Sequence, residues 1–509
     1  MTDIHAAYSD LAHRLSELST LTEIEGLLHW DQEVCMPDGA TGARGRQMAT
    51  IGVVRHERAT SDDLGKLLTE LDAHAALKPI ERANVREARR AYDLAKGLPA
   101  ALVHQWGEAT VKAHGSWVAA RAASDFSLFA DDLQHLVDLA RAKAKAIDPT
   151  RPTYDVLIDN FEPGMTMDRL DEVFAELRDF LVPFLAKIRA RPQIDTTSIA
   201  GDVAEDDQET VAKALAEALG YDLQYGRIDT AVHPFCGGAG ATDVRITTRY
   251  LRDQFHQSLL AVVHETGHAM YEQGRTRELA DQPVSFARSM GVHESQSLLW
   301  ETQVARSHAF WRGRLPWLKE QYTFLAGVDL ETFVAAINAV DFTNAIRVNA
   351  DEVTYPLHVI LRYELERDLL SGALAVRDLP AAWNERMEAW FGFVPTDDAQ
   401  GVLQDIHWSM GAFGYFPSYT LGALYAAQIF AAAGRALPGL DAQLANGDFK
   451  QLRAWLREHI HQHGSRWSTD ELIERATGST LDLTWFIQHI ERRYGALYGL
   501  STGSAATAG

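Results

Sequence analysis

The stretch Leu259-Leu-Ala-Val-Val-His-Glu-Thr-Gly-His-Ala-Met270 decides how the rest of the chain is interpreted. Its apolar residues predict a buried helix that carries His264 and His268 on one face, one turn apart. Two imidazoles at this spacing can bind one zinc ion together, and Glu265 can then act as general base on a water molecule beside the metal. Burying two histidines and a carboxylate is costly unless they have such a role. The motif therefore predicts a catalytic zinc site.

A catalytic zinc ion needs a third protein ligand and one open position. The metzincin continuation requires glycine at position 271 and histidine at position 274, but the chain has Tyr271 and Gly274, so that class is excluded. A glutamate from a second helix is the other common solution. The candidates downstream of the motif are Glu272, Glu278, Glu294 and Glu301.

The position of each glutamate along the chain indicates how well it suits the role of third ligand. Glu272 lies roughly 12 Å beyond His264 on the same helix, which suits a supporting contact or a surface ion pair. Glu278 falls in a polar stretch before Pro283 and is expected to be a solvated loop charge. Glu294 lies in an apolar-flanked helix after Pro283, which can pack back on the first helix. Glu294 is therefore the predicted third ligand, with Glu301 as the second candidate.

The remaining sequence is dominated by helical periodicity. Helices are predicted at 6–27, 82–96, 132–147, 167–181, 207–219, 259–273, 287–312, 330–340, 354–370, 379–391, 449–463 and 481–494. Strand patterns occur only at 221–232 and 242–250, separated by a turn-rich segment, and predict a small antiparallel sheet. No linker or repeat interrupts the chain. Residues 1–500 are therefore expected to form one α-helical unit, and the small, polar residues 501–509 a disordered tail.

Composition excludes several classes of protein. The 509 residues are 46% hydrophobic and carry a formal charge of −22, which argues against binding of nucleic acid or an anionic membrane. The two cysteines, Cys35 and Cys236, make neither a disulfide framework nor a metal motif. Residues 409–434 are uncharged, but glycines and a proline interrupt them, so they are expected to form buried core. Without a signal-peptide pattern at the N-terminus, a cytoplasmic location is expected.

Several short motifs of the chain resemble the thermostable carboxypeptidase Taq family of zinc metallocarboxypeptidases. They are His233-Pro-Phe235, Asp243-Val-Arg-Ile-Thr247, His264-Glu-Thr-Gly-His268, His293-Glu-Ser-Gln296, Ile346-Arg-Val-Asn-Ala-Asp351, Gly401-Val-Leu-Gln-Asp-Ile-His-Trp408 and the N-terminal stretch Leu27-Leu-His-Trp-Asp-Gln-Glu-Val-Cys-Met-Pro37. Their order and spacing follow the family over nearly the whole chain. The resemblance is therefore more specific than the zinc-binding pattern alone.

The resemblance implies a fold, an activity and a metal. The fold would be a mainly α-helical saddle with a deep central groove and a small sheet beside the zinc helix, similar to angiotensin-converting enzyme and neurolysin. The activity would be that of a broad carboxypeptidase acting on peptides, as a homodimer, with zinc that cobalt can replace. In the family the glutamate of the His-Glu-Ser-Gln motif is the third ligand, and it corresponds to Glu294.

Further residues receive roles from this resemblance and from chemistry. A carboxypeptidase must bind a terminal carboxylate, which the planar fork of arginine does well. Arg347 is the first candidate and Arg245 the second, each with an acidic neighbour that offers a structural ion pair instead. The strand at 243–247 is expected to pair with an extended peptide. His233, which precedes a proline, is expected either to line the groove or to cap a turn.

Stabilisation of the oxyanion is assigned by the same resemblance. In the angiotensin-converting-enzyme-like architecture a histidine and a tyrosine donate hydrogen bonds to it, and these correspond to His407 and Tyr415, with Tyr419 as the alternative to Tyr415. Each tyrosine can also be a packed core residue. The predicted mechanism thus uses Glu265 as base and acid. A zinc oligopeptidase or dipeptidyl carboxypeptidase is the main alternative, and a non-catalytic peptide-binding scaffold is another.

Overall fold

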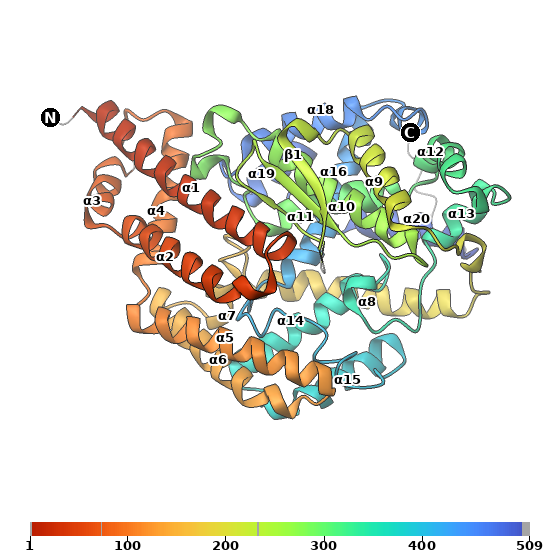
Figure 1. The fold of residues 1–509 in the computed structure, drawn as a ribbon, viewed down its shortest axis with the longest axis horizontal. Coiled ribbons are helices and arrows are strands. Elements are labelled where there is room, and N and C mark those ends of the chain that lie inside the picture. The colour runs from red at the N-terminus through yellow and green to blue at the C-terminus, as the bar shows by residue number, and fades with distance from the viewer. Residues whose placement is uncertain (1–2, 73, 232–233, 501–509) are drawn as a thin grey trace.

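The computed structural model describes residues 3–72, 74–231 and 234–500, and most of the chain is helical, as Figure 1 shows. The helices are α1 (Ile4–Val34), α2 (Thr41–Ala59), α3 (Asp62–Leu71), α4 (Pro79–Lys96), α5 (Ala100–Ala123), α6 (Ser127–Ile147), α7 (Thr153–Ile158), α8 (Met167–Arg189), α9 (Glu205–Leu219), α10 (Phe255–Gly274), α11 (Met290–Leu298), α12 (His308–Gln321), α13 (Leu330–Ile337), α14 (Tyr355–Ser371), α15 (Leu379–Phe391), α16 (Pro417–Ala436), α17 (Leu440–Ala445), α18 (Lys450–His459), α19 (Thr469–Thr477) and α20 (Thr484–Leu497). The strands are β1 (Gly226–Thr230), β2 (Cys236–Gly238) and β3 (Val244–Thr248). The expected mainly α-helical chain with a small central β element is confirmed.

The three strands form one sheet in the order β1-β3-β2. β2 pairs antiparallel with β3, but β1 pairs parallel with it, so the prediction of an antiparallel sheet is wrong. A tight turn explains the difference: Gly238 and Gly240 have φ angles of 118° and 76°, and the N–H of Ala239 donates to the carbonyl of Asp243. The chain reverses between β1 and β2 and again at this turn, so β1 and β3 run in the same direction.

The position of β3 at the centre of the sheet has a consequence for peptide binding. Both of its edges are already paired, so the predicted pairing of an extended peptide with residues 243–247 is wrong. β2 is an edge strand instead. Its first residue, Cys236, lines the large cavity described below.

Two glycines allow α11 to pack closely between α10 and α16. A Cβ atom at Gly267 of α10 would lie 2.6 Å from the carbonyl oxygen of Gln296 and 2.7 Å from the Cα of Ser297. A Cβ atom at Gly422 of α16 would lie 2.6 Å from the Cγ of Glu294. Larger residues at these positions would push the helices apart. The two glycines therefore fix how Glu294 faces the histidines of α10.

The predicted helix at 287–312 is divided in the structure. It consists of α11, a π-helical segment (Leu299–Ala305) and α12. Ser307 caps the start of α12 by accepting from the N–H of Phe310, and Asn338 donates to the freed carbonyl of Arg306 at 3.0 Å. The π-helical segment contains Glu301, which contacts the zinc-motif helix. Such segments are frequent at functional sites.

Most buried apolar side chains belong to one continuous core, and α1, α3 and α4 have a smaller core of their own. The two are joined by contacts such as the 2.9 Å hydrogen bond from Asn84 to Gln282. Within the described ranges, none of the helices has both the length and the apolar character needed to cross a membrane. Of the uncharged residues 409–434, those from 417 onward form most of α16, which is buried along most of its length, as expected. The predicted tail at 501–509 lies outside the described residues.

Candidate metal centre

Three side chains from two helices converge on one point. His264 and His268 come from α10 and Glu294 from α11, and one ligand atom of each lies within 4.8 Å of the others. The Oε2 atom of Glu294 is 3.7 Å from Nε2 of His264 and 3.2 Å from Nε2 of His268. Two imidazole nitrogens and one carboxylate oxygen are a donor set that suits zinc. The structure thus brings together all three predicted ligands in a fitting geometry.

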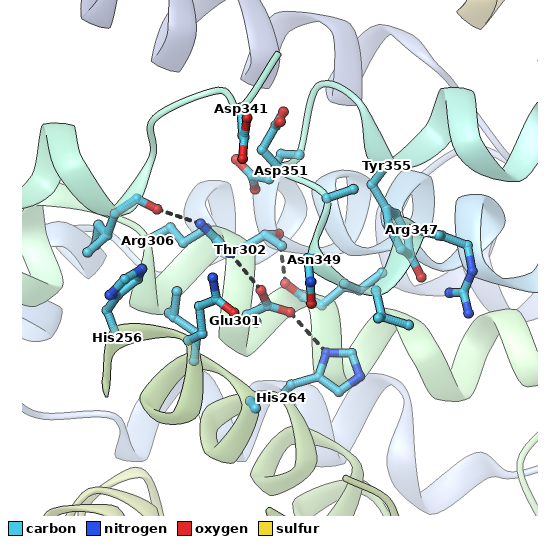
Figure 2. A pocket seen from close by; sticks show the side chains of 18 of the residues that line it. His256, His264, Glu301, Thr302, Arg306, Asp341, Arg347, Asn349, Asp351 and Tyr355 are labelled. Atoms are coloured by element: carbon cyan, nitrogen blue, oxygen red, sulfur yellow. Dashed lines mark hydrogen bonds and ion pairs between the residues drawn. The ribbon is translucent and has the colours of Figure 1, made fainter. Parts of the chain in front are cut away.

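The predicted ligands lie in the wall of a cavity of about 1260 Å³. Figure 2 shows part of it, with Glu301 between His264 and Arg306 and with Tyr355 and Arg347 farther along the wall. This volume exceeds what a single amino acid fills. The cavity therefore has room for several residues of an extended peptide.

Glu265 lies between the two histidines in the sequence. It is buried in the fold, and it also lines the cavity. Its Oε2 atom has no hydrogen-bond partner among the described residues. Burial raises the pKa of this carboxyl to about 7, with His264 lowering it and the charges of Glu294 and Glu301 raising it further. A buried carboxylate with a free oxygen and a pKa near neutrality is suited to accept a proton from water.

The charges around the two histidines differ. Burial lowers the pKa of His264, but Glu294 and Glu301 outweigh it and raise the pKa to about 10. Burial lowers the pKa of His268 to about 4, despite its hydrogen bond to Glu294. The pKa of Glu294 itself falls to about 2 because the two histidines outweigh its burial. The carboxylates that favour a proton on His264 also attract a metal cation. A proton and a metal ion therefore compete for the Nε2 atom of His264, which faces Glu294.

The other glutamates have supporting or distant positions. Glu301 accepts from Nδ1 of His264 at 3.0 Å and from Arg306 at 3.1 Å, so it contacts the ring nitrogen that faces away from Glu294. Glu272 forms an ion pair with Arg275 at 2.6 Å. Glu278 is exposed, as predicted for a loop charge.

Arg347 lines the cavity and is held by an acid that the sequence did not single out. Its Nε and Nη2 atoms donate to Oδ1 of Asp405 at 3.0 and 2.7 Å, while Arg362 binds the other carboxylate oxygen. The neighbouring Asp351 instead stabilises the turn that precedes α14 by accepting from Thr354. The Nη1 atom of Arg347 makes no hydrogen bond to a described residue. This atom is therefore available to donate a hydrogen bond.

Arg245 lies elsewhere and His233 is outside the described residues. The guanidinium of Arg245 forms two hydrogen bonds to Asp243, at 2.7 and 2.6 Å, and stacks over the ring of Trp30. It does not belong to the cavity wall as described. The alternative prediction for Arg245, a structural ion pair with an acidic neighbour, is therefore the one that the structure shows.

Two tyrosines stand between His407 and the cavity. Tyr415 and Tyr419 line the cavity wall, whereas His407 lies behind them. The Nε2 atom of His407 is 3.0 Å from the hydroxyl of Tyr419, which in turn accepts a hydrogen bond from Tyr415. Burial lowers the pKa of His407 to about 3, so the ring is neutral and its Nε2 and the hydroxyl of Tyr419 share one hydrogen bond.

Sequence reasoning missed Tyr355 altogether. This residue begins α14, lines the cavity, and lies close enough to both Glu294 and Arg347 for their charges to act on its hydroxyl. Burial raises its pKa well above the usual range. The only signal in the sequence is its place four residues after the Ile346–Asp351 motif.

Comparisons with known proteins agree with this geometry. Residues 10–494 match the family model described as "Carboxypeptidase Taq (M32) metallopeptidase". The chain is 40% identical to thermostable carboxypeptidase 1 of Thermus thermophilus, over 97% of this chain and 99% of the relative, and 35% identical to carboxypeptidase 1 of Bacillus subtilis over the same shares. The M32 carboxypeptidase from Deinococcus radiodurans has a similar structure, with a TM-score of 0.93 and 39% identity over 97% of this chain and 100% of that one. Trypanosoma cruzi metallocarboxypeptidase 1 also has a similar structure, with a TM-score of 0.92 and 38% identity over 96% of this chain and 99% of that one.

Proposed function

Because this chain belongs to the carboxypeptidase Taq (M32) family of metallopeptidases and is a metallocarboxypeptidase, we propose that it releases single C-terminal amino acids from peptides, with broad specificity. The observation that carries the proposal is the cluster of His264, His268 and Glu294 beside Glu265 in the cavity wall. The predicted saddle shape with a deep groove, the homodimer and the cytoplasmic location stay predictions.

Zinc is the proposed metal, with cobalt as a substitute. The donor set of two histidines and one glutamate supports this choice over magnesium or calcium, which prefer oxygen ligands. When bound, zinc supplies a Lewis acid that polarises a carbonyl group and lowers the pKa of a water molecule. Glu294 and both histidines would hold it, since the Oε2 atom of Glu294 and the two Nε2 atoms face one another.

Glu265 is the proposed general base and acid. Its unpartnered Oε2 atom accepts a proton from the attacking water and later delivers it to the amino group of the departing residue. Burial and the neighbouring carboxylates keep its pKa close to neutrality, so both transfers are possible.

Arg347 is the proposed partner of the substrate's terminal carboxylate, through its free Nη1 atom. Asp405 and Arg362 hold the guanidinium from behind, so it is already oriented before substrate binds. Arg245 is bound to Asp243 and lies away from the cavity wall, so we do not assign it this role.

The oxyanion is proposed to receive a hydrogen bond from a tyrosine hydroxyl. Tyr415 and Tyr419 line the cavity, and a neutral His407 with its proton on Nε2 donates to the hydroxyl of Tyr419, which leaves the proton of that hydroxyl for the oxyanion. In this arrangement His407 orients the tyrosine rather than touching the substrate.

Mass spectrometry of the products from an N-blocked peptide tests the proposal. Zinc-loaded protein should remove one residue at a time from the free C-terminus, and neither chelated protein nor a C-terminally amidated peptide should give products. Loss of dipeptides or internal cleavage would instead indicate the oligopeptidase alternative. Zinc binding without any cleavage would indicate the scaffold.

A further inference from the structure

A chain of polar contacts leads from His268 away from the proposed metal. The Nδ1 atom of His268 lies 2.6 Å from the Nδ1 atom of His293, and the Nε2 atom of His293 lies 3.0 Å from Oε1 of Glu272. The other oxygen of Glu272 accepts from Arg275 at 2.6 Å. Sequence reasoning assigned His293 no role, although it stands next to Glu294.

The protons in this chain can be placed in only one consistent way if His268 binds metal through Nε2. That nitrogen faces Glu294 and must be unprotonated, so the proton of His268 is on Nδ1. Two nitrogens 2.6 Å apart share one proton, so Nδ1 of His293 accepts it. The proton of His293 is then on Nε2 and is donated to Glu272, whose charge Arg275 balances.

His264 is also linked to a glutamate and an arginine, but without a second histidine in between. Its Nδ1 atom contacts Glu301 directly, and Arg306 balances that carboxylate. Each proposed histidine ligand is thus backed by a glutamate–arginine pair, but only His268 has an imidazole in between. A carboxylate partner makes a metal-binding imidazole more electron-rich than a neutral partner does. The two nitrogen ligands are therefore chemically unequal.

We propose that His293 is a positioning residue, which holds His268 in the Nδ1–H tautomer and at the correct angle by linking it to Glu272 and Arg275. The inference rests on the metal ligands named under the proposed function. A packing role would depend on the shape of the side chain, whereas this role depends on an acceptor atom at the Nδ1 position. His293 also packs against Tyr271, with ring centroids 5.1 Å apart, so both contributions must be separated.

Three substitutions at His293 and one at Glu272 separate the positioning role from the packing role. The Oδ1 atom in His293→Asn can take the place of Nδ1 and keep the acceptor for His268. The amide in His293→Gln takes the place of Nε2 and keeps only the contact to Glu272. His293→Phe keeps the ring and removes both contacts. Glu272→Gln weakens the chain from its far end without changing His293.

Zinc affinity is measured for each variant at one fixed pH, by competition with a chromophoric chelator, together with the visible spectrum of the cobalt-loaded protein. His293→Gln and His293→Phe should each bind zinc about 10- to 100-fold more weakly and show an altered cobalt spectrum. His293→Asn should stay within about threefold of wild type. His489→Asn, at a buried histidine of α20, is the control for loss of a core imidazole and should leave zinc affinity unchanged.

The result that overturns the inference is equal zinc affinity for all three His293 variants with an unchanged cobalt spectrum, or a loss in His293→Asn as large as in His293→Phe. Metal-free melting curves identify any variant that fails to fold, and Glu272→Gln then provides the test. Wild-type protein that binds no zinc, or a His268→Ala variant that still binds it normally, would refute the proposed function instead. The two failures are therefore distinguishable.

Discussion

Replacing Glu265 by glutamine should remove activity and, in the metal-free protein, raise stability at alkaline pH. The side chain is 6% exposed, and the amide matches it in size, so the fold and the three ligands stay in place. General acid–base catalysis contributes about 10²- to 10⁴-fold. We expect kcat/KM to fall by that factor, about 3–5 kcal/mol at 1.36 kcal/mol per decade, while the zinc content stays the same.

The stability effect follows from the raised pKa of this carboxyl. Its pKa is about 7 in the folded chain against 4.5 for the free side chain, because of burial and the charges of Glu294 and Glu301. A carboxyl with a raised folded pKa loses stabilisation as pH rises from 4.5 through 7, because the folded state must then ionise a buried group. The full loss is about 3 kcal/mol above pH 7, at 1.36 kcal/mol per pKa unit. Glutamine cannot ionise and avoids this loss.

Thermal unfolding in the presence of chelator measures the difference. For a chain of this length the unfolding entropy is about 1.1 kcal/mol/K, so 3 kcal/mol corresponds to roughly 3 °C. The variant should melt about 3 °C above wild type at pH 8 and at nearly the same temperature at pH 5. The same difference in Tm at both pH values would refute the argument for the pKa. Turnover above a tenth of wild type would refute the role as base.

Three further substitutions, the first with a matched control at Arg245, test other residues of the site and of the buried core. Arg347→Ala should lower kcat/KM about 10- to 100-fold for peptides with a free C-terminus, because a charged hydrogen bond is lost, whereas Arg245→Ala should have little effect in the same assay. Gly267→Ala should lower the unfolding free energy by about 1–3 kcal/mol in urea titrations and weaken zinc binding, because its Cβ would push α10 away from α11. Glu366→Gln should cost about 1–3 kcal/mol in the same titrations. The glutamate accepts from Tyr154, Trp408 and the backbone of Gly414, and an amide with one oxygen cannot accept from all three.

Local geometry explains which parts of the site could be predicted from the sequence. The spacing of His264 and His268 fixes their common face, because a helix repeats within four residues. The apolar pattern around Glu294 predicted a second helix, and the break at Pro283 allowed it to fold back. Their convergence within 4.8 Å follows from these two local patterns and one close helix contact at Gly267.

Contacts between distant segments could not be predicted in the same way. Arg347 is held by Asp405, which is 58 residues away along the chain, whereas the nearby Asp351 binds Thr354 instead. His407 was expected to touch the oxyanion, but the loop that carries it places Tyr419 in front of it. The parallel pairing of β1 with β3 likewise depends on a turn whose tightness comes from two glycines at positive φ. Periodicity contains no information about any of these pairings.

The choice between Glu294 and Glu301 as third ligand shows where local reasoning ends. They are seven residues apart, which is two turns of an α-helix, so periodicity places both on the same face toward α10. The structure distinguishes them by the nitrogen each one approaches: Glu294 faces Nε2 of both histidines, and Glu301 faces Nδ1 of His264. A ring cannot bind a metal and donate a hydrogen bond through the same nitrogen. Glu294 is therefore in the position of a ligand, and Glu301 in that of a partner that fixes the tautomer of His264.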